Sequence, residues 1–200
     1  MKRWFFLFGA GMLLWLWLRP PPPAHWNGRI APEAPHQTAD RLPSSWRRDG
    51  FTFAALARFD LRAVVLSRCN YHGGYDGELA PTDFALGWGC MSDAAVLNRV
   101  KVKQDMRWFF VEWPADPPAA PGEMMSSSAN MHLIPASDEV RRELAHVRRH
   151  EILELSGYLV DITRADGWRW TSSLSRDDQG GGACEVVWVE KVHASASPAN

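Results

Sequence analysis

Hydrophobic and polar positions alternate along several short stretches of the chain. Residues 58–66, RFDLRAVVL, place an apolar side chain at every second position, between charged ones. This two-residue period is the pattern of a β-strand with one buried face. Residues 100–113 predict another strand, with apolar side chains on both of its faces. Residues 183–192, ACEVVWVEKV, predict the last strand, and residues 193–200 a disordered tail.

A helix is predicted directly after Ser137, whose side chain suits the N-cap position. Two acidic residues follow it, which favours the start of a helix because the helix dipole is positive there. Val140, Leu144 and Val147 have the i, i+4, i+7 spacing of one buried helix face.

The strand predicted at residues 152–162, ILELSGYLVDI, changes the parity of its apolar positions at Gly157. A glycine at such a change indicates a bulge or a bend. Residues 165–167, ADG, predict a tight turn, after which Trp168 begins a return strand. The connection SRDDQGGG then leads to the last strand.

These elements predict a mainly β domain with one or two short helices. Several strands, one bent at a glycine and preceded by a helix, favour a small antiparallel barrel of the OB-like type. A long insertion at residues 67–99 interrupts the first half of this barrel. The domain is expected to occupy residues 51–192.

Residues 1–18 predict a hydrophobic anchor or an uncleaved signal. Two basic residues precede fifteen uncharged, mostly apolar ones at 4–18. As a helix this run spans about 22 Å, shorter than the roughly 30 Å hydrocarbon core. No pair of small residues suits a cleavage site, so we expect a short transmembrane helix. The basic flank predicts a single-pass protein of the bacterial inner membrane with its C-terminal domain in the periplasm.

Residues 19–50 contain seven prolines and little periodicity. Proline-rich segments form semi-rigid, extended spacers. We therefore expect this region to hold the domain away from the membrane.

The composition narrows the classes of function. A net charge of −1 argues against a nucleic-acid-binding protein that acts through overall positive charge. The chain has eleven tryptophans. Tryptophan combines a large apolar ring with one N–H donor, so it serves cores, protein interfaces and sugar-stacking surfaces.

Four segments also resemble a known family. They are DFALGWGCMSD at 83–93, SANMHLIPA at 128–136, SGYLVDI at 156–162 and WRWTSSLSRDDQGGGACEVVWVE at 168–190. Together they resemble a family of mostly proteobacterial proteins of similar length with an N-terminal hydrophobic segment. No activity is attached to this family, so the resemblance implies no catalytic role. The family pattern has proline at Cys90 and lacks Cys69, whereas Cys184 fits it.

Two of the three cysteines are expected to pair in an oxidising compartment, and three pairings are open. Cys69 and Cys90 both depart from the family pattern and bracket a glycine-rich stretch. A disulfide between them is therefore predicted, and it would contribute about 3 kcal/mol to stability. Cys184 would then be a free thiol.

One enzyme hypothesis pairs Cys184 as nucleophile with His132 as base, with Asp93 or Asn130 orienting the imidazole. A weaker version uses Ser128 with His132, but the chain has no G-x-S-x-G motif. The histidines and cysteines have no short paired spacing, so no metal or cofactor is expected.

A binding role fits the residue pattern better than catalysis does. Planar hydrogen-bonding groups near stacking rings are how β-barrels hold sugars or nucleobases. The competing interpretation is core packing for the rings and a plain turn for SRDDQGGG. The predicted binding residues are Trp88, Trp168, Trp170, Arg176, Asp177 and Asp178.

The sequence thus favours a membrane-anchored, exported, non-catalytic domain that binds a partner protein, a glycan or an envelope component. No nucleic-acid partner is expected. One alternative is a thiol hydrolase or transferase centred on Cys184 and His132. Another is a scaffold subunit of a membrane complex that uses residues 4–18, with Trp15 and Trp17, as its interface.

Overall fold

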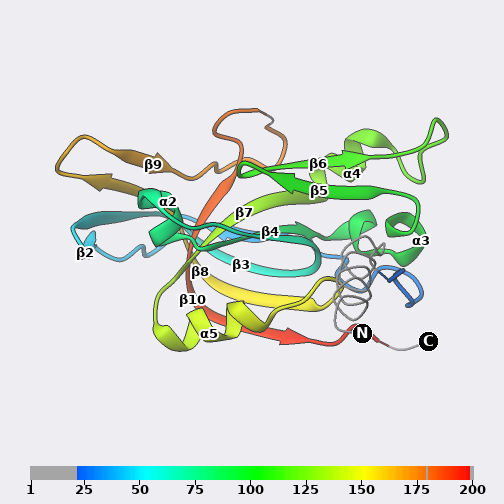
Figure 1. The fold of residues 1–200 in the computed structure, drawn as a ribbon, viewed down its shortest axis with the longest axis horizontal. Coiled ribbons are helices and arrows are strands. Elements are labelled where there is room, and N and C mark those ends of the chain that lie inside the picture. Colours follow the sequence, from blue (N-terminus) through cyan, green and yellow to red (C-terminus); the bar gives the residue numbers. More distant parts are fainter. Residues whose placement is uncertain (1–21, 179, 199–200) are drawn as a thin grey trace, which may run out of the picture.

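The computed structural model describes residues 22–178 and 180–198. They form a mainly β structure, as the alternating pattern predicted (Figure 1). The predicted anchor at residues 1–18 lies outside the described residues. Among the helices that are described, none is long and apolar enough to cross a membrane.

The elements follow one another along the chain with few long connections. In order they are β1 (His36–Thr38), β2 (Trp46–Arg48), β3 (Phe51–Asn70), α2 (Gly74–Leu79), β4 (Thr82–Gly87), the 3₁₀ helix η1 (Gly89–Ser92), α3 (Ala94–Leu97), β5 (Lys101–Asp105), β6 (Trp108–Glu112), α4 (Pro121–Ser126), β7 (Ser128–Pro135), α5 (Asp138–His146), β8 (Ile152–Arg164), β9 (Arg169–Thr171) and β10 (Glu185–Ser195).

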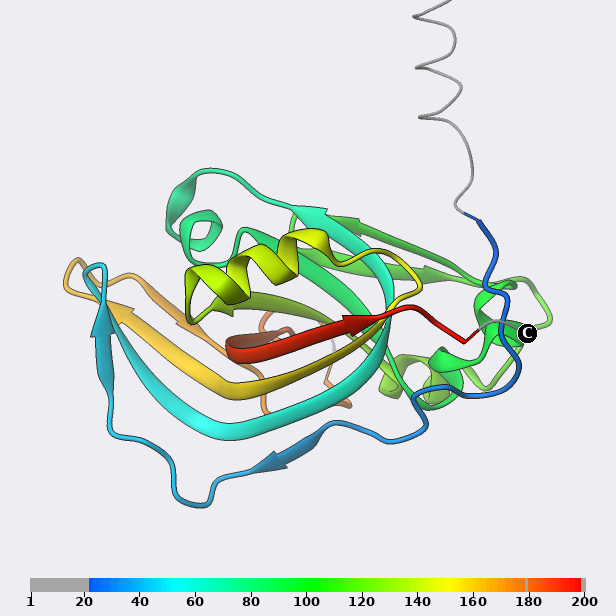
Figure 2. The same ribbon diagram turned by 90° about the horizontal axis from the view of Figure 1, so that it is seen from below.

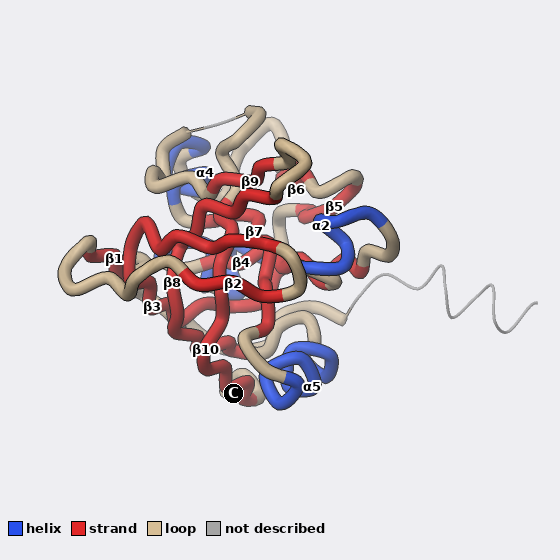
Figure 3. Tube along the Cα trace, turned by 90° about the vertical axis from the view of Figure 1, so that its left-hand side faces the viewer, coloured by secondary structure: helices blue, strands red, loops and turns tan. Residues whose placement is uncertain are grey.

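The main sheet has eight strands among the described residues, and five of them form its central part, which we call the central sheet. Their pairings run β3–β4–β7–β10–β8, and β8 also pairs with β3, so the path of pairings returns to its first strand. All of these pairs are antiparallel except β7 with β10, which is parallel. Figure 2 shows β3 and β8 curving together along their length. The helices lie at the outside of the strands (Figure 3).

The main core lies against one face of these five strands. It contains large buried side chains from every strand, among them Phe59, Phe84, Met131, Leu153 and Val187. The opposite face carries two smaller clusters. One packs β3 and β4 against η1, α3 and β5, and the other packs β3, β8 and β10 against α2, β2 and β9. Most central strands are therefore buried on both faces.

The predicted helix is confirmed as α5. The Ser137 hydroxyl accepts a hydrogen bond from the backbone N–H of Val140 at 3.2 Å. Val140, Leu144 and Val147 are all buried in the main core. The i, i+4, i+7 stripe thus becomes the contact between α5 and the sheet.

The parity change expected at Gly157 has a different cause. Leu155 and Leu159 lie in the main core, and Tyr158 and Val160 lie in the cluster on the opposite face. The strand therefore keeps its alternation, and only its second half is covered on both faces. The irregularities lie in the neighbouring strands, where the register shifts at residues 56 and 190.

Gly157 is needed for a close approach between strands. A Cβ at this position would meet the carbonyl oxygen of Trp188 at 1.9 Å. The ADG turn is present, and Gly167 within it has a φ of 90°. It joins β8 to β9, the return strand predicted from Trp168.

Several predicted boundaries differ from the structure. Residues 100–113 form the hairpin β5–β6, which turns at Met106 and Arg107 and is separate from the central sheet. The segment 67–99 is not an insertion, because it includes the end of β3 and the central strand β4. The long connection is instead the one between β4 and β7, which contains η1, α3, the β5–β6 hairpin and α4.

The two ends of the domain also extend further than expected. Within the predicted spacer, β1 and β2 pair with β3, and Trp26 is 3% exposed. The Trp26 indole N–H donates to the carbonyl of Ser92 at 2.9 Å. β10 continues to Ser195, inside the predicted tail. At the N-terminal end, β1 and β2 pair with the edge of β3 and Trp26 packs against a core cluster. At the C-terminal end, β10 continues to pair with β8 as far as Ser195.

Candidate functional site

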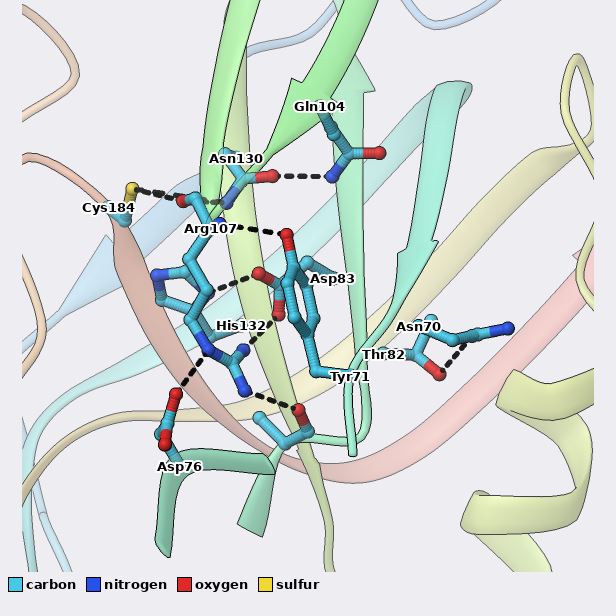
Figure 4. Close-up of polar contacts among 11 residues, drawn as sticks. Asn70, Tyr71, Asp76, Thr82, Asp83, Gln104, Arg107, Asn130, His132 and Cys184 are labelled. Atoms are coloured by element: carbon cyan, nitrogen blue, oxygen red, sulfur yellow. Dashed lines mark hydrogen bonds and ion pairs between the residues drawn. The ribbon is translucent and has the colours of Figure 1, made fainter. Parts of the chain in front are cut away.

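A buried polar cluster lies on β4 and β7, with Asp83 at its centre (Figure 4). The Asp83 carboxylate is fully buried and accepts a hydrogen bond from Arg107 Nη1 at 2.7 Å. Its other oxygen lies 2.8 Å from Nδ1 of His132, which is also buried. A buried carboxylate requires such partners, because unpaired charge is costly away from water.

The strand period explains why Asp83 and His132 meet. Phe84 and Leu133 point into the main core, so their neighbours Asp83 and His132 point to the opposite face. The two residues are also direct register partners across β4 and β7. Directly opposed side chains on one face of a sheet lie within contact distance.

Arg107 reaches this face from the turn of the β5–β6 hairpin. Met106 and Arg107 have positive φ values of 45° and 66°, the conformation of a two-residue hairpin turn. Besides Asp83, the guanidinium binds Asp76 through Nε at 2.6 Å and donates to the carbonyl of Ala80 at 3.1 Å. These contacts fix a charged side chain that is only 15% exposed.

The backbone of Arg107 is held as firmly as its side chain. Its N–H donates to the Tyr71 hydroxyl at 2.8 Å, and its carbonyl accepts from Asn130 Nδ2 at 2.9 Å. Gln104 donates to the Asn130 amide oxygen at 2.6 Å. These hydrogen bonds fix the hairpin turn onto β7. Burial also raises the pKa of Tyr71 above its ordinary value.

Aromatic rings border the cluster. The Arg107 guanidinium lies 4.2 Å from the ring centroid of Tyr71 and 5.2 Å from that of Trp170. The Trp170 ring also contacts His132, with 4.9 Å between ring centroids, and packs edge-on against Trp168. Cation–π and ring contacts of this kind add to the stability of the site.

A cavity of about 430 Å³ opens beside these rings, and we name it the Trp cleft. It combines aromatic walls with a few fixed polar groups, which is typical of small-molecule sites. Its lining residues are Asp76, Arg107, Trp108, His132, Trp168, Arg169, Trp170, Thr171, Gly180, Gly182 and Cys184. Two of the predicted binding residues, Trp168 and Trp170, are therefore in the cleft.

The other predicted binding residues lie elsewhere. Arg176, Asp177 and Asp178 line a second cavity, and Arg176 pairs with Glu185 at 3.0 Å rather than with either aspartate. Trp88 lines neither cavity. It is 3% exposed within the main core. Its flanking glycines have structural roles, because a Cβ on Gly87 would meet the carbonyl oxygen of Met91 at 2.5 Å and Gly89 has a positive φ of 50°.

The predicted Cys184–His132 pair has a different arrangement from the expected one. Asp93, predicted to orient His132, instead caps α3 by accepting a hydrogen bond from the backbone N–H of Ala95. The carboxylate beside His132 is that of Asp83. Cys184 Sγ lies 4.0 Å from Asn130 Nδ2 and 3.8 Å from the carbonyl of Arg107. Burial raises the pKa of Cys184 to about 11, which disfavours the reactive thiolate.

The predicted Cys69–Cys90 disulfide is absent, and all three cysteines are free. Cys90 is buried in η1 against the second core cluster, whereas Cys69 lies near the end of β3 opposite Asp83. The glycine-rich stretch between them contains β4, which holds them in different packing environments. In the chain outside residues 1–21, 179, 199 and 200, no group of His, Cys, Asp or Glu side chains is placed to hold a metal ion.

Sequence reasoning missed Asp76, Asp83, Arg107 and Glu185. Asp83 had one available signal, since it is a charged residue at the start of an otherwise apolar strand, TDFALG. No sequence signal identified Arg107, because the turn that carries it lies within residues 100–113, which were predicted as one continuous strand. Comparisons with protein-family models, curated proteins and solved structures give no match to this chain. The family resemblance therefore stays a prediction.

Proposed function

We propose that this protein is a non-catalytic, glycan-binding domain whose ligand lies in the Trp cleft. The supporting observation is the pair of half-buried rings, Trp168 and Trp170, beside buried polar groups that Asp83 holds in place. Sugar rings stack on tryptophan and hydrogen-bond to planar polar side chains. The predicted anchor at residues 4–18 would hold the domain at the outer face of the bacterial inner membrane.

The strand order supports this assignment. We interpret β3–β4–β7–β10–β8, with α5 before β8, as an OB-like five-stranded barrel. Such barrels bind oligosaccharides and oligonucleotides on their second and third strands and on the loops after strands one and four. The corresponding elements here are β4, β7 and the segments 71–81 and 165–184. β7 and both of these segments contribute residues to the Trp cleft, and Asp83 of β4 holds two of its lining residues, Arg107 and His132.

Charge favours a glycan over a nucleic acid. The two arginines of the cleft, Arg107 and Arg169, are both paired, with Asp76 and Asp83 and with Asp161. Nucleic-acid sites need unpaired basic groups for the phosphates. A neutral, hydroxyl-rich ligand matches a cleft whose arginines are already paired with carboxylates.

A thiol hydrolase or transferase is the second candidate. One observation favours it: Asp83 orients His132, and both His132 and Cys184 line the Trp cleft. The raised pKa of Cys184 and its contacts with Asn130 and Arg107 weigh against it. The scaffold hypothesis depends on residues 4–18, which lie outside the described chain.

Isothermal titration calorimetry of the full chain in detergent micelles tests the glycan proposal. Soluble oligosaccharides of the chitin and cellulose types are the probes. We expect binding to the wild type and a loss of roughly tenfold or more in affinity for Trp170→Ala. Trp113→Ala removes a partly exposed tryptophan outside the cleft and should bind like the wild type. No binding of either oligosaccharide, or equal binding by Trp170→Ala, would overturn the proposal.

A further inference from the structure

A second cavity, of about 410 Å³, adjoins the Trp cleft and shares Trp108, Gly180 and Cys184 with it. We name it the Glu185 cavity. Its walls come from β6, α4, β7 and residues 175–178 and 180–185, and they combine polar groups with the apolar side chains of Phe109, Met125 and Ala129.

Glu185 is an unusual residue to find in this place. It has the same parity as Val187 and Val189, which fill the main core, and it is only 1% exposed. Its Oε1 pairs with Arg176 Nε at 3.0 Å. The Arg176 guanidinium in turn lies 5.6 Å from the ring centroid of Phe59, a main-core residue. The ion pair therefore lies where the core meets the cavity.

This ion pair is only half satisfied. Neither Glu185 Oε2 nor Arg176 Nη1 has a hydrogen-bond partner among the described residues, although both atoms are shielded from solvent. Buried polar atoms nearly always have partners, and an unsatisfied one costs free energy. Both residues line the cavity. A ligand that brings one donor and one acceptor would satisfy both atoms.

A secondary amide has the required chemistry on adjacent atoms. Its carbonyl accepts a hydrogen bond and its N–H donates one. A methyl group on the amide would find apolar contacts with Phe109, Met125 and Ala129, which a bare hydroxyl would leave unused. In a sugar, this group is the acetamido substituent.

We propose that the Glu185 cavity receives the acetamido group of an N-acetylhexosamine while the rest of the glycan lies in the Trp cleft. When Glu185 is ionised, the amide N–H donates to Glu185 Oε2, and the carbonyl accepts from Arg176 Nη1. This inference rests on the proposed glycan-binding function and specifies its ligand class. The two cavities share Trp108, Gly180 and Cys184 as a border, and the proposed ligand crosses this border.

The test compares three tetrasaccharides by calorimetry on the full chain above about pH 8, where Glu185 is ionised and can accept a hydrogen bond from the amide N–H. Chitotetraose bears acetamido groups, its fully de-N-acetylated form bears free amino groups, and cellotetraose bears hydroxyls. We expect the wild type to bind chitotetraose roughly tenfold or more tightly than either of the others, because an unmatched polar site rejects analogues. Equal affinity for chitotetraose and cellotetraose would overturn this inference and leave the glycan proposal standing. Tighter binding of the de-N-acetylated form would also overturn it. If no tetrasaccharide binds, both proposals fail.

Variants locate the selectivity. Glu185→Gln should bring the ratio of the chitotetraose and cellotetraose affinities close to one while cellotetraose still binds. Glu190→Gln, an exposed glutamate on the same strand, should keep the wild-type ratio. Because Glu185→Gln alters a buried pair, Ala183→Phe serves as a second variant that fills the cavity and leaves the pair intact. Unchanged selectivity in Ala183→Phe, with native circular dichroism, would contradict the assignment.

Discussion

Asp83 and His132 face each other across β4 and β7, with 2.8 Å between Oδ2 and Nδ1. The same carboxylate accepts from Arg107, a residue that reaches the sheet from the β5–β6 turn. One buried group thus joins two neighbouring strands to a hairpin outside the central sheet. The position of the Trp cleft depends on this connection, because Arg107 and His132 both line it.

Replacing Asp83 should destabilise the fold strongly. Asp83→Asn removes the negative charge that faces Arg107 inside the protein, and breaking a buried ion pair costs about 3 kcal/mol or more. Urea unfolding followed by tryptophan fluorescence measures the change. Asp116→Asn, whose carboxylate is 93% exposed beside Arg99, should change stability little. Similar stability for the two variants would contradict the buried arrangement.

Gly157 should not tolerate alanine. Its Cβ would lie 1.9 Å from the Trp188 carbonyl oxygen, which is backbone and has no side-chain freedom to move away. We expect a loss of about 3 kcal/mol or more in the free energy of unfolding. Gly122→Ala meets no atom within 4 Å and should be close to neutral. A wild-type urea midpoint for Gly157→Ala would show that these strands are further apart than in this structure.

Trp26 should contribute to stability although it lies in the proline-rich region. It is 3% exposed and hydrogen-bonded to Ser92. Trp26→Ala should cost about 3 kcal/mol, the usual range for removing a buried tryptophan. Trp113→Ala removes a 38% exposed ring and should cost less. Equal thermal stability of Trp26→Ala and the wild type would restore the spacer interpretation for this region.

Cys184 should react slowly with iodoacetamide in the native protein. Burial raises the pKa of its thiol from 9.0 to about 11, so its thiolate fraction near neutral pH falls roughly a hundredfold. Peptide mass spectrometry measures the rate. After denaturation without reductant, all three cysteines should be alkylated. Rapid native labelling of Cys184 would favour the thiol-enzyme candidate, and labelling of Cys184 alone would indicate a Cys69–Cys90 disulfide.

Glu185 should make stability depend on pH. Burial, and to a smaller extent Asp178, raise its pKa to about 8, although Arg176 acts in the opposite direction. Between the ordinary pKa of 4.5 and about 8 the folded state binds more protons than the unfolded state. The free energy of unfolding contributed by Glu185 is therefore fully present below about pH 4.5 and is lost as the pH rises to about 8.

The difference between wild type and Glu185→Gln isolates this contribution, because other groups titrate in the same window. His150 acts with the opposite sign, since burial, Arg149 and His25 lower its pKa to about 4. Urea midpoints at several pH values should diverge between the two proteins as the pH rises. Parallel curves would show that Glu185 stays ionised in the folded protein.

Local patterns predicted the elements whose structure depends on neighbours in the chain. Ser137 and the Val140, Leu144, Val147 stripe specified α5, because capping and helical periodicity act within one or two turns. The tight turn before Trp168 was equally local. The prediction of a single strand at residues 100–113 was wrong. Apolar side chains on both faces gave this run the pattern of one continuous buried strand, whereas it forms the β5–β6 hairpin. Nothing in that run marks the turn at Met106 and Arg107.

The sequence by itself determined a mainly β chain with α5 and the turn before Trp168. Only the tertiary structure decided which polar groups meet. Asp83 finds His132 through strand register, and Arg107 arrives from a separate hairpin. Glu185 finds Arg176 across a loop. Register and docking are set by side chains far apart in the chain, so no local pattern encodes these contacts.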